Sequence, residues 1–247
     1  MGRGRRVVLV LVATTALLVA GPVGPSGGGR NGGHSDTYSV GIDRRAFTTE
    51  IDNPFLPLKP GNRWVYEGTG DGGQAMRSVV EVTSTTREVM GVKCVVVRDK
   101  TTVDGQVVED TFDWYAQDVE GNVWYFGQNS LEYAHGRLVS APGNWEAGVS
   151  GARAGMVMMA NARVGDRYDQ EFHPGEDLEV GEVLSLDERM VGQYGMIFDG
   201  VLEIRDYAPL GTGSVEHRYF ARDVGMVREV TTRGGSATSE LVGMNRA

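Results

Sequence analysis

Cysteine is almost absent from this chain. Among 247 residues only Cys94 carries a thiol, so no disulfide can form within one molecule. The fold must therefore be held by its hydrophobic core. A domain of about 210 residues buries roughly 70% of its unfolded surface, which is sufficient for this. Cys94 lies in the apolar run Val92–Val97, which predicts a buried core thiol rather than a nucleophile.

Basic residues are also scarce. The net charge is −9, with 24 Lys and Arg residues against 33 Asp and Glu residues. Four arginines precede Asp36, so the remaining chain has 20 basic against 33 acidic residues, or −13. A surface this acidic repels phosphate, which argues against nucleic acid as a partner. Cations and neutral or cationic ligands remain, and a partner recruited by charge alone would bind less tightly as salt rises.

Helical and catalytic patterns are missing as well. No stretch of eleven residues repeats apolar side chains at helical spacing between two caps. The sequence contains no G-x-S-x-G elbow, P-loop, H-E-x-x-H or paired C-x-x-C motif. These absences disfavour the common hydrolases and favour a noncatalytic protein.

The amino end carries the most specific signal in the chain. Residues Met1–Arg6 hold three arginines, and Val7–Ala20 is an apolar run broken only by Thr14 and Thr15. This pattern is typical of a secretory signal peptide. The alternative is a membrane anchor, but 14 residues rise only about 21 Å as a helix, against roughly 30 Å of hydrocarbon.

We therefore expect a signal peptide over 1–20, a flexible Gly/Pro/Ser linker over 21–37 and a single β-rich domain over 38–247. No stable membrane span would remain after cleavage. The expected location is outside the cytosol: the cell envelope, the periplasm or the extracellular space.

Past the linker, glycine separates short segments whose side chains alternate in character. This spacing predicts antiparallel strands in a curved sheet that forms a barrel or half-barrel, an all-β fold with little helix. In the arm Thr111–Ala116, alternation places Phe112 and Trp114 on an apolar face and Thr111, Asp113 and Tyr115 on a mostly wet one. Strands are expected over Gly61–Glu67, Arg77–Thr86, Val92–Val103, Gln106–Val119, Val123–Gly127, Arg137–Ala141, Val164–Phe172, Glu179–Leu186, Val201–Tyr207, Val215–Ala221 and Met226–Arg233.

Three connecting segments stand out. Asp104-Gly105 tolerates the positive φ angles of a type I′ turn and predicts a hairpin between the strands on either side. Pro54, Pro57 and Pro60 force an extended entry that is expected to cross a barrel end as a strap. Gly143–Gly155 holds four glycines and is expected to be the longest irregular loop, the connection best placed to carry a site or a lid.

Several of these stretches resemble a known family. The residues are Asn53–Glu67, Asp113–Asp118 with Gly121–Gly127, and Val215–Phe220. They are similar to a widespread, uncharacterised family of exported bacterial β-rich proteins, the curved-sheet envelope proteins. In part of that set a strand ends Tyr-Ala-Pro-Gly-Val-Gly-Leu-Val-Lys, whereas Phe220–Arg228 lacks the Pro-Gly turn. The resemblance implies a fold and a location, and it supplies no catalytic residue.

One polar cluster predicts a metal site. In a strand ending at His173, the side chains of Asp169, Glu171 and His173 project to one face at two-residue spacing. With carboxylates and an imidazole, such a face would hold a divalent cation as cofactor. The alternative is the solvated face of an edge strand, whose charges deter aggregation. This site underlies the alternative function, a metal-binding protein or enzyme.

Aromatic residues predict a ligand site. The set comprises Trp64, Tyr66, Trp114, Trp124 and Tyr168, all in expected strands. Facing a common apolar lumen, they would bind a small hydrophobic or amphiphilic molecule. Ordinary core packing is the alternative. The function expected first is thus noncatalytic: binding of such a molecule, or a structural role in the cell envelope. The sequence leaves the oligomeric state open.

Overall fold

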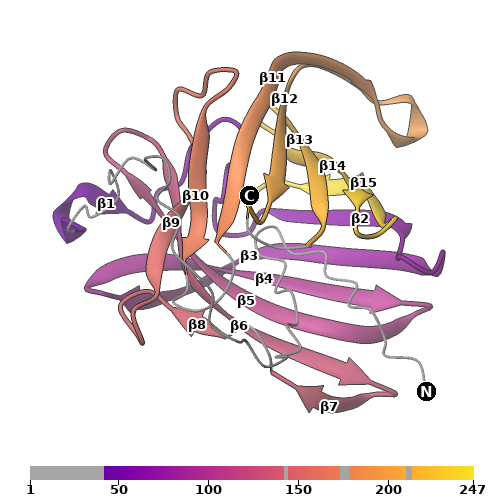
Figure 1. The fold of residues 1–247 in the computed structure, drawn as a ribbon, viewed down its shortest axis with the longest axis horizontal. Coiled ribbons are helices and arrows are strands. Elements are labelled where there is room, and N and C mark those ends of the chain that lie inside the picture. The colour runs from indigo at the N-terminus through magenta and orange to yellow at the C-terminus, as the bar shows by residue number, and fades with distance from the viewer. Residues whose placement is uncertain (1–41, 142–143, 173–177, 210–212) are drawn as a thin grey trace, which may run out of the picture.

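A computed structural model describes residues 42–141, 144–172, 178–209 and 213–247, so the expected signal peptide and linker lie outside the described residues. Two 3₁₀ helices, η1 (Arg44–Ala46) and η2 (Gln193–Gly195), accompany the strands (Figure 1). The strands are β1 (Phe47–Thr48), β2 (Arg63–Thr69), β3 (Ala75–Val89), β4 (Val92–Val103), β5 (Gln106–Asp118), β6 (Val123–Ala134), β7 (Arg137–Ser140), β8 (Trp145–Glu146), β9 (Arg153–Met158), β10 (Arg167–Phe172), β11 (Glu179–Val191), β12 (Ile197–Tyr207), β13 (Val215–Ala221), β14 (Gly225–Arg233) and β15 (Thr238–Asn245).

Twelve of these strands close into an antiparallel barrel. The hydrogen-bonded order is β5-β4-β3-β2-β15-β14-β13-β12-β11-β10-β9-β6, and β6 returns to pair with β5. The short strands β1, β7 and β8 attach to this wall through β5 and β6. The prediction of an all-β, antiparallel barrel is confirmed. Within the described part of the chain, no helix has the length and apolar character that a membrane span needs.

All eleven expected strands have a counterpart in the structure, and strands also form in stretches where none was expected. The Asp104-Gly105 turn joins β4 to β5 with φ angles of 48° and 78°, as a type I′ turn requires. The stretch expected to be an irregular loop, 143–155, instead contains β8 and the start of β9. Strand β15, which pairs with β2 and completes the barrel, was not expected from the sequence.

Strands β11 and β12 continue beyond the barrel as a two-stranded arm, which Figure 1 shows curving over the side of β13–β15. At its tip, η2 lies against β15. The tip exposes Val191, Tyr194 and Ile197, and Tyr194 is 82% exposed. Strand β11 runs five residues past the expected end at Leu186, and β12 begins four residues before the expected start at Val201.

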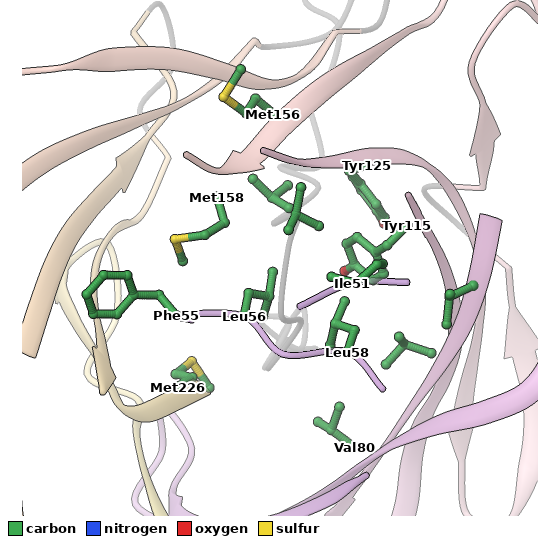
Figure 2. Close-up of a cluster of buried hydrophobic side chains, with 14 of the residues drawn as sticks. Ile51, Phe55, Leu56, Leu58, Val80, Tyr115, Tyr125, Met156, Met158 and Met226 are labelled. Carbon is green, nitrogen blue, oxygen red and sulfur yellow. The ribbon is translucent and has the colours of Figure 1, made fainter. Parts of the chain in front are cut away.

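One half of the barrel interior is apolar and is filled by the proline-rich strap. Ile51, Phe55, Leu56 and Leu58 are buried, and Figure 2 shows them between Met158, Met226 and Val80 of the barrel wall. The amide of Asn53 holds the strap in place by donating hydrogen bonds to the carbonyl oxygens of Gly121 and Met159. The strap expected from the prolines therefore packs inside the barrel and forms part of its hydrophobic core.

The other half of the interior is polar, and here the sequence-based assignment of faces was wrong. Thr111, Asp113 and Tyr115 were expected on a wet face, but all three are at most 1% exposed. The strands on either side of β5 carry polar partners at the same level: Asp99 of β4 pairs in register with Thr111, and Gln128 of β6 pairs with Asp113. The sequence correctly predicted that these three side chains share one face of β5, but that face points into the barrel and not into solvent.

Candidate functional site

An arginine lies at the centre of the polar half. Arg218 on β13 has 3% of its side chain exposed, and three carboxylates surround it. Its Nε lies 2.7 Å from Glu229 and its terminal nitrogens 3.0 Å from Glu216 and 3.1 Å from Asp206. Burial alone would lower the pKa of Arg218, but these carboxylates hold it well above its ordinary value. This group is an ion network sealed inside the barrel.

A second set of buried carboxyl groups lies on β4 and β5. The hydroxyls of Thr111 and Ser130 each donate to Glu109 at 2.9 Å, and the Tyr125 hydroxyl lies 2.8 Å from Asp113. Burial, together with the neighbouring carboxylates of Glu109 and Asp113, raises the pKa of Asp99 well above its usual range. Burial likewise raises the pKa of Asp113. Asp99 and Asp113 therefore favour the protonated form, and Asp113 also accepts a hydrogen bond from the Tyr125 hydroxyl.

Outside the barrel wall, a groove of about 550 Å³ lies between the N-terminal segment and strands β6, β9 and β10. We call it the outer groove. Figure 1 shows β1 at the edge of the molecule, where it pairs with β5. The apolar side chains that line the outer groove are chiefly those of Ile42, Phe47, Met90, Trp124, Met156 and Phe172. These side chains suit an organic molecule with an apolar body.

Trp124 is held rigidly in this groove. Its indole Nε1 donates to the Asp118 carboxylate at 2.8 Å. Phe47 packs edge-on against the indole ring with 6.0 Å between ring centroids. The same Asp118 accepts hydrogen bonds from the backbone of Glu120 and Asn122, which fixes the β5–β6 turn. The aromatic wall is therefore preorganised by a carboxylate that is itself anchored.

The floor of the groove depends on a close approach of β9 to β10. A Cβ atom on Gly155 would lie 2.1 Å from the carbonyl oxygen of Gln170, so only glycine fits there. Beside it, Arg153 places its guanidinium 3.9 Å from the centroid of the Phe172 ring. A cation stacked on an aromatic face is thus already part of this groove.

The residues of the predicted metal site are only partly brought together. Asp169 and Glu171 both line the outer groove. A register irregularity between them means that β10 does not alternate strictly there. His173 lies outside the described residues. Within the described ranges, no three His, Cys, Asp or Glu side chains are grouped so that they could hold a metal ion.

The five aromatic residues of the predicted ligand site are distributed over several places. Trp64 and Tyr66 are buried and donate hydrogen bonds to the carbonyl oxygens of Val224 and Met226. Tyr168 is buried, and Trp114 lies under the Arg87 guanidinium at 4.0 Å. Trp124 alone of the five lines the outer groove.

Sequence reasoning missed the N-terminal side of this groove. Phe47 pairs in register with Asp118, which brings β1 against the end of β5. A lone aromatic in a short segment gives no local sign of such a distant partner. The expected loop 143–155 does contribute, because Ala152–Gly155 line the groove.

No family model and no curated protein matches the chain. Two solved structures are similar in shape. One is a protein from Bacteroides fragilis described as exported, with a YmcC-like fold (TM-score 0.45, 13% identity). The other, from Parabacteroides distasonis, is described as a lipoprotein (TM-score 0.40, 12% identity). Each match covers 78% of this chain and 99% of the other.

Proposed function

We propose that this chain is an exported, noncatalytic barrel protein that binds an amphiphilic small molecule in the outer groove. The observation that carries the proposal is the groove itself: about 550 Å³, walled by Phe47, Trp124 and Phe172 and rimmed by polar groups. Sites for small organic molecules are typically about 300–1,000 Å³, mostly apolar and largely preformed. The hydrogen bond between Trp124 and Asp118 gives this groove the same preformed character.

Export is supported by the apolar run Val7–Ala20 behind three arginines. A noncatalytic role is supported by the absence of common catalytic motifs from the sequence. The buried carboxyl groups of the barrel interior have a different use. With Arg218 tied to three of them, they are best explained as internal structure.

A fluorescent probe tests the groove. The chain from Gly21 onward is titrated with N-phenyl-1-naphthylamine, an uncharged apolar dye at neutral pH. We expect fluorescence to rise saturably, with one dye bound per chain. Ala46→Trp fills the groove from its partly exposed N-terminal wall and should weaken dye binding at least about tenfold, a loss of roughly 1.4 kcal/mol.

The matched control is Ala75→Trp, which adds the same indole at an exposed position at the start of β3. This variant should bind the dye as the parent does. Unchanged affinity in Ala46→Trp, or an equal loss in both variants, would count against the groove as the binding site.

A further inference from the structure

We propose that the molecule bound in the outer groove is a cationic amphiphile, with an ammonium group held between Trp124 and Asp118 and an apolar body along Phe47 and Met156. This inference rests on the proposed function and names the charge class of its ligand.

The charges that line the groove have one predominant sign. Five carboxyl side chains border it, against the single guanidinium of Arg153; they are Asp43, Asp118, Glu120, Asp169 and Glu171. The whole chain adds to this field with its net charge of −9. A cleft lined by one sign of charge with low-dielectric walls concentrates ligands of the opposite sign. An anionic amphiphile would have to place its head among these carboxylates.

The aromatic wall supplies the second half of the recognition. Tryptophan binds a cation over its ring face more strongly than any other side chain, and ammonium groups are the usual ligands of such faces. The Trp124 Nε1–H donates to Asp118 at 2.8 Å, which fixes the ring and places a carboxylate at its edge. One hydrogen-bonded pair therefore presents a π face and a negative charge together.

A cation already lies against an aromatic ring on the β10 side of the groove. Arg153 stacks on Phe172 with its guanidinium 3.9 Å from the ring centroid. Trp124 belongs to β6 and Phe172 to β10. The space between these walls is bordered by Met156, whose thioether adapts to apolar bodies of different shape.

Displacement of the neutral dye tests the charge class. The competitors share a ten-carbon chain and differ in the head: decyltrimethylammonium, decanol and decanoate, all below their aggregation concentrations. We expect the ammonium compound to displace the dye at about five- to tenfold lower concentration than decanol, consistent with one ring-face contact and partly screened charges. Decanoate should be the weakest competitor. Added salt should reduce the preference for the cation.

Two substitutions locate the effect. Glu120→Gln combined with Asp169→Asn removes two charges from the lining and should cut the ammonium preference, measured against decanol in the same variant, to about two- to threefold. Asp104→Asn is the control, because Asp104 is exposed in the β4–β5 turn and outside the groove. It should leave the preference as in the parent.

The outcomes separate the two proposals. Dye binding with equal displacement by decanol and decyltrimethylammonium, or with decanoate as the best competitor, overturns the cationic ligand and leaves the groove as a binding site. A preference that survives the double substitution unchanged also overturns it. A dye that does not bind removes the proposed function and this inference together.

Discussion

The two halves of the barrel interior are built on the same alternation and filled with opposite chemistry. Around the strap, Leu56 and Leu58 pack against apolar wall residues. Around Arg218, the inward positions are carboxylates, hydroxyls and amides, including Asp206 and Glu229. The named side chains of both halves are buried. The difference teaches that burial in this barrel does not follow hydrophobicity, because inward charges are acceptable where a counter-charge or a proton accompanies them.

Removing the cation should break the polar half. In Arg218→Met, Asp206, Glu216 and Glu229 lose their shared partner while they remain buried. We expect a loss of about 3–5 kcal/mol in the free energy of unfolding, the usual cost of leaving a buried charge uncompensated. Urea unfolding followed by tryptophan fluorescence measures it. Arg77→Met is the control, because the Arg77–Glu67 pair is 47% and 43% exposed and should contribute at most about 1 kcal/mol. Equal losses in both variants would contradict the assigned role.

Opening a cavity in the apolar half should cost slightly less. Leu58 is fully buried, at 0% exposed, so Leu58→Ala should lower the free energy of unfolding by about 3 kcal/mol. The same urea experiment applies. Leu138→Ala removes the same atoms from a side chain that is 57% exposed and should change stability by no more than about 0.5 kcal/mol. A negligible loss at Leu58 would mean that the strap does not pack as described.

A change of pH should separate the halves by an effect that is smaller than these losses for each pH unit. Burial raises the pKa of Glu229 from 4.5 to about 8 in the folded protein. The folded state therefore retains a proton that the unfolded chain releases above pH 4.5. The resulting stability is fully present below that pH and is lost as pH rises through about 8. Each such proton contributes a slope of at most about 1.4 kcal/mol per pH unit.

Urea midpoints measured between pH 5 and pH 8 check this prediction. Glu229→Gln removes the titrating group and should flatten the decline over that range. Leu58→Ala, in the apolar half, should lower the whole curve and leave its slope as in the parent. A decline that is as steep in Glu229→Gln as in the parent protein would contradict a protonated Glu229 in the folded state.

The sequence predicted the barrel well because strand alternation and turn chemistry are local. Asp104-Gly105 demands its hairpin whatever surrounds it. Alternation separates two faces of a strand but does not say which one points inward. For Thr111, Asp113 and Tyr115 the polar character suggested water, whereas their partners on neighbouring strands determine that they are buried. Strand β15 was missed for a related reason, since an irregularity between Leu241 and Gly243 interrupts its alternation.

The candidate site was less predictable than the fold. Trp124, Asp169 and Glu171 were each singled out from the sequence, but for two different sites, and the structure places them around one groove. What joins them is the pairing of Phe47 with Asp118 and the irregularity in β10. Both are products of long-range packing, which local periodicity cannot report.

The junction of β2 with β15 sets the order of events when the molecule is made. Arg63 of β2 pairs with Asn245 of β15, so β2 cannot complete its pairing until β15 has been made. Until residues 238–245 leave the ribosome, the wall stays open at β2. Chain closure over such a long separation is slow. Hairpins between consecutive strands form early, because their pairings are local, but the ring of strands is complete only when the final strand has been made.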